Sequence, residues 1–117
     1  MNAVRLKRIY QPADTGDGTR VLVDRLWPRG LLKAEARVDL WLKDVAPSVE
    51  LRRWFAHRPD RWAVFRHRYL AELADNPAAL QLRDLAERGG LTLLYAAKDE
   101  AHNHAIVLAG HLAAARA

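Results

Sequence analysis

The chain has 117 residues, half of them hydrophobic, and its 19 Lys and Arg residues against 14 Asp and Glu give a formal net charge of +5. This length matches the commonest domain size of about 100–150 residues, so we expect a single domain over residues 1–117. The absence of cysteine excludes disulfides and thiolate chemistry, and no stretch approaches the ~18 apolar residues needed to span a bilayer.

The first part of the chain predicts strands separated by loops. Residues 4–10 alternate apolar and basic side chains, which is typical of a strand with one solvent-exposed face. Residues 20–26 contain three consecutive apolar residues, which favours a strand covered on both faces, as in a parallel sheet. Residues 31–43 are ambiguous, and the alternation over 38–43 permits a short edge strand.

The middle of the chain is predicted to be helical. Ser48 is a suitable N-cap for a helix over residues 49–57. Residues 61–74 carry aromatic and aliphatic side chains at helical spacing, and Pro77 suits the first turn of a third helix.

The last third of the chain predicts one more strand and one more helix. The stretch LTLLYAA at residues 91–97 has the composition of a buried strand, and Asp99 is a candidate cap for a final helix. The order of strands, helical block, strand and helix predicts an α/β fold, in which a small, mainly parallel β-sheet carries helices packed on its faces.

Two polar clusters follow the two buried strands. In parallel sheets, ligands bind outside the carboxyl ends of the strands, so the motifs DRLWPRG and KDEAHNH are expected to converge on one rim. The side chains expected there are Asp24, Arg25, Arg29, Lys98, Asp99, His102 and Asn103.

This set of side chains indicates a pocket for a small anionic ligand, such as a nucleotide or a sugar phosphate. Arg25 and Arg29 suit bidentate binding of a phosphate, with Lys98 as a further cation. Gly30 would let the backbone approach the ligand closely. Asn103 offers both a donor and an acceptor.

The catalytic candidates are His102, which can exchange a proton near neutral pH, and the carboxylates of Asp24 and Asp99, which would orient its partners. Each residue also has a purely structural interpretation: Asp24 and Arg25 as an ion pair, Asp99 as a helix cap and Trp27 as a cover for the core.

The sequence does not decide whether the protein is an enzyme. Classical catalytic and nucleotide-binding motifs are absent, and no cofactor is indicated. His102 and His104 do not share a helical face, so no metal site is predicted. The lack of a signal peptide favours a cytoplasmic protein without a membrane partner, and the oligomeric state stays open.

Two other functions are consistent with the sequence. Residues 50–70 interleave arginines with Trp54, Trp62 and Tyr69, a pattern that could bind nucleic acid, although the aromatic residues could equally form a core stripe with solvated arginines. Exposed tryptophans at positions 41 or 54 would instead indicate a protein-partner surface without catalysis.

Four motifs, RVLVDRLWPRG, WLKDVAPS, LRRWFAHRPDRWAVFRHRYLAEL and TLLYAAKDEAHNHAIVL, resemble the bacterial domain-of-unknown-function 488 (DUF488) family, in its short YeaO-like branch. The resemblance implies no established activity. Its motif positions match Asp24, Arg25, Trp27, Pro28, Arg29, Gly30, Trp41, Lys43, Asp44, Pro47, Ser48, Trp54, Phe55, His57, Trp62, Phe65, Arg68, Tyr69, Tyr95, Lys98, Asp99, His102 and Asn103. His104 falls where the family pattern is loose, and the Cys-His-Arg signature of the longer branch has no counterpart in this cysteine-free chain.

Overall fold

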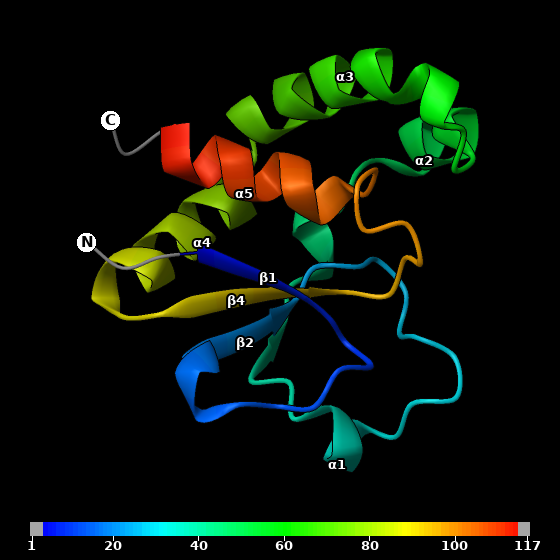
Figure 1. Ribbon diagram of the computed structural model, residues 1–117. Helices are drawn as coiled ribbons and strands as arrows, with labels where there is room; N and C mark the ends of the chain where they lie inside the picture. Colours follow the sequence, from blue (N-terminus) through cyan, green and yellow to red (C-terminus); the bar gives the residue numbers. More distant parts are fainter. Residues whose placement is uncertain (1–3, 115–117) are drawn as a thin grey trace.

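Four strands form one all-parallel sheet in the order β1-β4-β2-β3 in the computed structural model, which describes residues 4–114 (Figure 1). Residues 1–3 and 115–117 of the predicted domain lie outside the described residues. The strands are β1 (Val4–Arg8), β2 (Thr19–Leu22), β3 (Leu40–Trp41) and β4 (Leu91–Tyr95). The helices are α1 (Lys33–Ala36), α2 (Val49–Phe55), α3 (Trp62–Ala74), α4 (Pro77–Arg88) and α5 (His104–Ala114), with short 3₁₀ turns at η1 (Thr15–Asp17), η2 (Lys43–Val45) and η3 (Pro59–Arg61). The predicted α/β class and the parallel sheet are both confirmed.

Strand β4 lies between β1 and β2, and all five of its residues are buried. Leu93 pairs with Leu6 on one side and with Val21 on the other. A strand with neighbours on both sides and covered faces needs apolar side chains in succession, which is why this segment shows a continuous run instead of an alternation.

Helices α2, α3, α4 and α5 cover one face of the sheet (Figure 1). The predicted stripe on α3 is confirmed, since Phe65, Tyr69 and Leu73 are buried in the same cluster as Leu93 of β4. Ser48 caps α2 as predicted, because its Oγ accepts a hydrogen bond from the Leu51 amide at 3.2 Å.

Of the described helices, α1 with its single turn lies on the opposite face, beside a smaller apolar cluster around Leu22 and Leu94 (Figure 1). The rings of Trp27 and Trp41 meet edge to face there, with centroids 5.5 Å apart. Helix α1 was not predicted, because four residues are too few to show a helical period, and the edge strand proposed over 38–43 is reduced to the two residues of β3.

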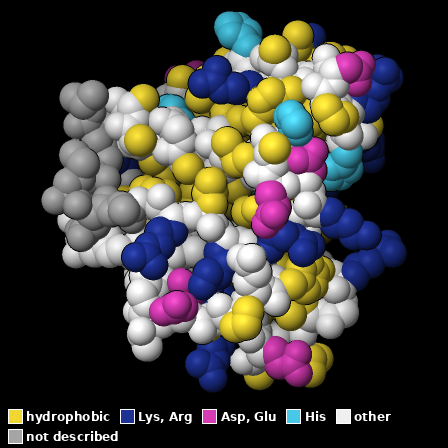
Figure 2. Space-filling view, in the orientation of Figure 1, with side chains coloured by type: hydrophobic (Ala, Val, Ile, Leu, Met, Phe, Trp, Pro, Cys, Tyr) yellow, Lys and Arg dark blue, Asp and Glu magenta, His cyan; other side chains and the backbone are white. Residues whose placement is uncertain are grey.

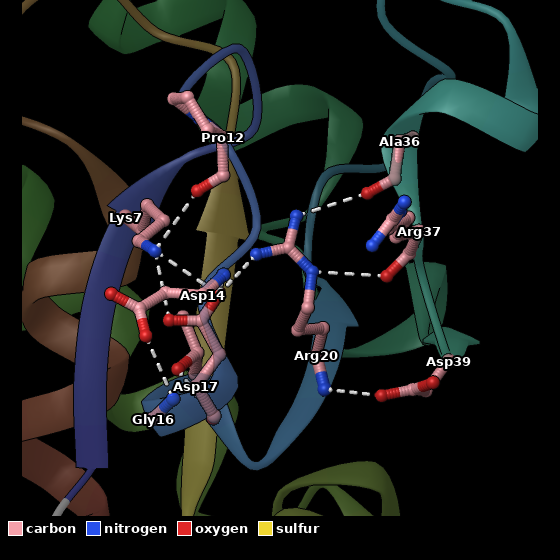
Figure 3. A network of polar contacts seen from close by, with 10 residues as sticks. Lys7, Pro12, Asp14, Gly16, Asp17, Arg20, Ala36, Arg37 and Asp39 are labelled. Atoms are coloured by element: carbon pink, nitrogen blue, oxygen red, sulfur yellow. Dashed lines mark hydrogen bonds and ion pairs between the residues drawn. The ribbon is translucent and has the colours of Figure 1, made fainter.

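A buried ionic network joins β1, the following loop, β2 and the α1 turn (Figure 3). Lys7 Nζ donates to Asp17 Oδ1 at 2.8 Å, and the Arg20 guanidinium pairs with Oδ2 of the same carboxylate. Arg20 also donates to the carbonyls of Ala36 at 2.9 Å and Arg37 at 2.9 Å. These bonds provide hydrogen-bond partners for the buried Arg20 guanidinium. They do not involve the carboxyl ends of the strands, which are free to form other contacts.

Candidate functional site

A cleft of about 910 Å³ opens where β2 and β4 end, between α2 and the start of α5. Its lining comprises Asp24, Arg25, Leu26, Ala46, Pro47, Val49, Arg52, Arg53, Phe55, His57, Phe65, Ala96, Ala97, Lys98, Asp99, His102, Asn103 and His104. Figure 2 shows histidine, acidic and basic side chains gathered on the right of this face, at the side where the strands end in Figure 1. Of the seven side chains expected to converge, six line this cleft.

Asp24 connects the ends of the two central strands. Its Oδ2 accepts a hydrogen bond from the backbone amide of Ala96 at 3.1 Å, just after β4. Its backbone carbonyl accepts from the indole Nε1 of Trp41 at 2.8 Å. The carboxylate is therefore fixed at the floor of the cleft by backbone geometry, which supports both a structural and a ligand-orienting role.

His104 is a cleft residue that the sequence interpretation missed, as are Arg52 and Arg53 of α2. Its Nε2 lies 3.0 Å from the Val23 carbonyl and 3.3 Å from Asp24 Oδ1. A carbonyl only accepts, so Nε2 carries the proton. Burial lowers the pKa of His104 and raises the pKa of Asp24, so the neutral imidazole donates its one N–H to the Val23 carbonyl, while Asp24 Oδ1 is buried without a hydrogen-bond partner.

The ring of His104 also packs edge to face on Tyr69 of α3, with centroids 6.2 Å apart. The Tyr69 hydroxyl donates to the Val45 carbonyl at 2.7 Å, and burial raises the pKa of this phenol. The burial of His104 could not be seen in the sequence, because it is a polar residue at the first position of a helix. It becomes covered only because α5 packs against the end of β2.

Asp99 and His102 form a hydrogen-bonded pair on the other side of the cleft. His102 Nδ1 lies 3.0 Å from Asp99 Oδ2, and the imidazole ring meets Trp62 edge-on at 5.3 Å. Hydrogen bonds from the backbone amide of Ala101 and from His102 lower the pKa of Asp99. An ionised carboxylate at Nδ1 favours the Nδ1–H tautomer and leaves Nε2 of His102 available as an acceptor.

Asp99 does not cap α5, contrary to the expectation. Its Oδ1 accepts from the amides of Ala101 and His102, both at 2.9 Å, in the turn before the helix. The helix begins at His104, and Asn103 acts as its cap because its Oδ1 accepts from the Ile106 amide at 3.1 Å. Helix α5 starts after this turn because the hydrogen bonds to the Asp99 carboxylate hold residues 99–102 in a turn, which competes with helix formation.

Four cationic side chains face the cleft without an ion-pair partner. No carboxylate among residues 4–114 forms an ion pair with any of these side chains, which are Arg25, Arg52, Arg53 and Lys98. Arg25 makes only long contacts from its terminal nitrogen, at 3.3 and 3.4 Å, to two backbone carbonyls, and its Nε is buried without a hydrogen-bond partner. The Asp24 and Asp99 carboxylates accept hydrogen bonds from backbone amides, and Asp24 attracts Arg52 electrostatically without an ion-pair contact, so Asp24 balances part of the positive charge in the cleft.

The second half of the first motif, Trp27 to Gly30, lies outside the cleft lining. Arg29 is exposed, and its carbonyl accepts a hydrogen bond from the Tyr10 hydroxyl at 3.3 Å. Gly30 has φ of 73°, and no atom lies within 4 Å of the position that a side chain would occupy, so its role in the structure is a left-handed turn. Trp27 covers the smaller cluster and donates to the Leu31 carbonyl at 2.7 Å.

Several of the other motif positions form contacts within the protein. Lys43 lies over the Trp41 ring at 5.1 Å, and Ser48 Oγ donates to a Glu72 carboxylate oxygen at 2.7 Å. The Asp44 carbonyl accepts from the side-chain amide of Asn76 at 2.9 Å. Burial raises the pKa of Tyr95, at the end of β4. Four other motif positions line the cleft, namely Pro47, Phe55, His57 and Phe65.

The aromatic residues of the arginine-rich segment are engaged within the molecule. The guanidiniums of Arg61 and Arg68 lie over the Trp54 ring, at 5.0 and 4.7 Å from its centroid. Tyr69 is buried, and Trp62 packs on Phe65 with centroids 5.7 Å apart. This arrangement matches the core-stripe interpretation, while nucleic-acid binding stays an untested prediction.

Two further features that could indicate a function are a group of metal-ligating side chains and a membrane-spanning helix. The described part of the chain holds no group of three or more His, Asp or Glu side chains placed to bind a metal ion. Between residues 4 and 114, no helix combines the length and apolar character required to cross a bilayer.

The fold and the cleft thus define an α/β domain with a cleft at the carboxyl ends of a parallel sheet. The chain belongs to the DUF488 family: residues 3–117 match the family model described as the inactive DUF488-N3 subclade. The sequence is 49% identical over 106 residues to the uncharacterized protein Rv3073c of Mycobacterium tuberculosis, covering 91% of this chain and 90% of that relative. It is 48% identical over 110 residues to the uncharacterized protein YeaO of Escherichia coli, covering 93% and 96% respectively. No solved structure matches the chain.

Proposed function

We propose that the cleft binds a small anionic ligand, such as a nucleotide or a sugar phosphate. The observation that carries this proposal is the set of four cations that face one concave surface and lack ion pairs among the described residues. Arg25 is half-buried, so solvent screens its charge less than the charge of a cation on open surface. The exposed Arg52, Arg53 and Lys98 add positive charge around it.

The arrangement of the polar groups supports this proposal. Arg25 enters from the end of β2 and Lys98 from the loop after β4, while Arg52 and Arg53 project from α2. Arginine forks suit the planar edge of a phosphate or carboxylate. The first turn of α5 adds the positive end of a helix dipole on the same side.

Ligand binding without turnover is the function that best fits these features. The matching subclade is described as inactive, and the polar groups with the firmest positions, Asp24 and His104, are held by backbone hydrogen bonds. In this proposal His102 Nε2, oriented by Asp99, accepts a hydrogen bond from the ligand. His102, Asp24 and Asp99 then orient a ligand instead of catalysing its reaction.

The test is calorimetric titration with inorganic phosphate, ribose 5-phosphate and adenosine 5′-monophosphate. We expect at least one probe to saturate the protein, and R25A to weaken its binding about 10-fold or more, because hydrogen bonds to charged groups contribute about 1.5–3 kcal/mol. R52A, at an exposed position, provides a second variant whose loss of affinity cannot come from disturbed packing.

R29A is the matched control, since it removes an arginine of the same motif from outside the cleft. Its affinity should equal that of the wild type, with thermal unfolding confirming that all three variants fold. Absence of saturable binding by every probe, or equal losses in R25A and R29A, would contradict the proposal.

A further inference from the structure

The turn that ends α2 holds two consecutive non-glycine residues in the left-handed region. Ala56 has φ of 48° and His57 has φ of 56°. This region costs most L-residues free energy because the Cβ crowds the following carbonyl, so single visits are usual and glycine is the common occupant. The chain places alanine and histidine there instead.

Two backbone hydrogen bonds flank His57 and hold this turn. The Ala56 amide donates to the Arg52 carbonyl at 3.0 Å, and the Arg58 amide donates to the Phe55 carbonyl at 3.0 Å. The result of the two left-handed residues is that His57 lines the cleft, whereas Ala56 does not. The backbone strain therefore coincides with the placement of one imidazole ring in the cleft.

Flat rings line the cleft around His57. The His57 ring lies 6.5 Å from the ring of Phe55, which in turn stacks on Phe65 at 4.3 Å. The ring of His102 lines the same cleft. Because Phe55 and Phe65 are 6% and 2% exposed, they form a floor, and the exposed His57 ring is the one free to meet a ligand from the α2 side.

The size of the cleft indicates a ligand larger than a bare anion. Its volume of about 910 Å³ falls within the range of roughly 300–1,000 Å³ typical of sites for small organic molecules. Resting on the proposed function, we propose that the ligand is an anion that carries a planar ring, of the nucleoside monophosphate class, and that His57 contacts this ring. The cations hold the phosphate, and His57 determines the preference for ligands with a ring.

The experiment compares three probes on four proteins. Wild type should bind adenosine 5′-monophosphate at least about 5-fold more tightly than ribose 5-phosphate or inorganic phosphate, since stacking on one aromatic side chain contributes roughly 1–3 kcal/mol. H57G should lose this preference while retaining its affinity for inorganic phosphate. H57N, whose side chain tolerates the left-handed region but carries no ring, should behave as H57G does.

A56G is the matched control, because it relieves the neighbouring left-handed residue without changing the cleft lining. We expect A56G and H57G each to raise the Tm by roughly 2–5 °C, and only H57G to change ligand preference. Equal loss of nucleotide affinity in A56G would overturn the proposal, because the geometry of the turn would then matter and not the imidazole.

The remaining outcomes separate this inference from the proposed function. A wild type that binds all three probes equally, or an H57G variant that keeps the nucleotide preference, would overturn the role of His57 while the effect of R25A still supports anion binding. A wild type that binds no probe would overturn the anion cleft itself, and the inference with it.

Discussion

At the scale of single residues, the Asp17 carboxylate pairs with two cations, Lys7 and Arg20. It is 2% exposed, and burial alone would raise its pKa, but the hydrogen bonds from Lys7, from the Asp14 amide and from Arg20 outweigh that effect and lower the pKa to about 2. Because the ordinary value is 3.8, the folded protein binds this proton more weakly than the unfolded chain does. The carboxylate therefore stabilises the fold above pH ~3.8, and the stabilisation is lost as the pH falls toward 2.

Substituting Asp17→Asn tests this network. The change leaves Arg20 and Lys7 without a counter-charge in a poorly solvated place, so we expect the free energy of unfolding to fall by about 3 kcal/mol at pH 7. Urea unfolding monitored by tryptophan fluorescence measures the difference. The gap between wild type and variant should narrow between pH 4 and pH 2, as the wild-type carboxylate gains its proton.

Asp60→Asn is the control for this substitution. Asp60 pairs with Arg58 at 3.0 Å, but both side chains are more than half exposed, so its loss should change the free energy of unfolding by less than about 0.5 kcal/mol. A D17N variant no less stable than D60N, or a gap independent of pH, would contradict the network's role.

At the scale of elements, the loop before β2 and the turn before β4 meet through glycine backbones. Gly18 has φ of 63°, and a Cβ at this position would lie 2.3 Å from the Gly90 carbonyl oxygen. That same carbonyl accepts the Thr19 amide at 2.9 Å, which aligns β2 with β4 at their amino ends. The close backbone approach therefore fixes the register that brings Asp24 and Ala96 together at the other end.

Substituting Gly18→Ala should lower the free energy of unfolding by at least about 2 kcal/mol, because the methyl group collides with rigid backbone and the left-handed conformation disfavours alanine. The measurement is thermal or urea unfolding. Gly89→Ala serves as control: Gly89 has an extended backbone and no atom within 4 Å of the added methyl, so stability should be unchanged or slightly higher. Equal effects at the two positions would refute the role of the close contact.

The elements predicted correctly from the sequence are those whose burial is continuous or strongly periodic. Strand β4 and helix α3 are of this kind. Helix α1 and the Asn103 cap were not predictable, because each depends on a single turn of backbone. His104 was missed for another reason: its partners, Val23 and Asp24, lie some 80 positions away in the chain, at separations of 81 and 80 residues.

The candidate site was predictable to the extent that strand topology decides it. Parallel pairing of β2 with β4 brings the two polar clusters together. The apolar runs predicted two buried parallel strands, and the further assumption that they are neighbours is confirmed by this pairing. The cleft wall supplied by α2 did not follow for Arg52 and Arg53, which reach it only through the angle at which this helix packs, whereas the position of His57 just before a turn did allow it to face the site. Arg29 lies outside the lining because the chain turns away after Pro28, which no spacing rule reveals.

At the scale of the whole molecule, the two faces of the sheet are covered unequally. One face carries four helices and the larger cluster, whereas the other carries the single turn of α1 and four fully buried residues, Ile9, Leu22, Ala36 and Leu94. Helix α1 has no side-chain cap, and Leu32 at its start is 65% exposed. Local stability follows buried apolar contact, so the thin layer opens more easily than the thick one.

Hydrogen–deuterium exchange checks this asymmetry. Amides of residues 30–37 should exchange at least about 10-fold faster than those of β4, because opening the α1 turn exposes little apolar surface. The internal reference is α3, whose amides should exchange at rates close to those of β4. Equal protection of the α1 segment and β4 would show that the sheet and both layers open as one unit.

The strand order also determines which strand edges are open to pairing with another copy of the protein. With β4 and β2 inside, the open hydrogen-bonding edges belong to β1 and β3. One edge strand carries the positive side chains of Arg5 and Arg8, and the other is two residues long. Repulsion along one border and shortness along the other both disfavour the addition of a foreign strand, which keeps a sheet with a fully apolar centre from seeding aggregates.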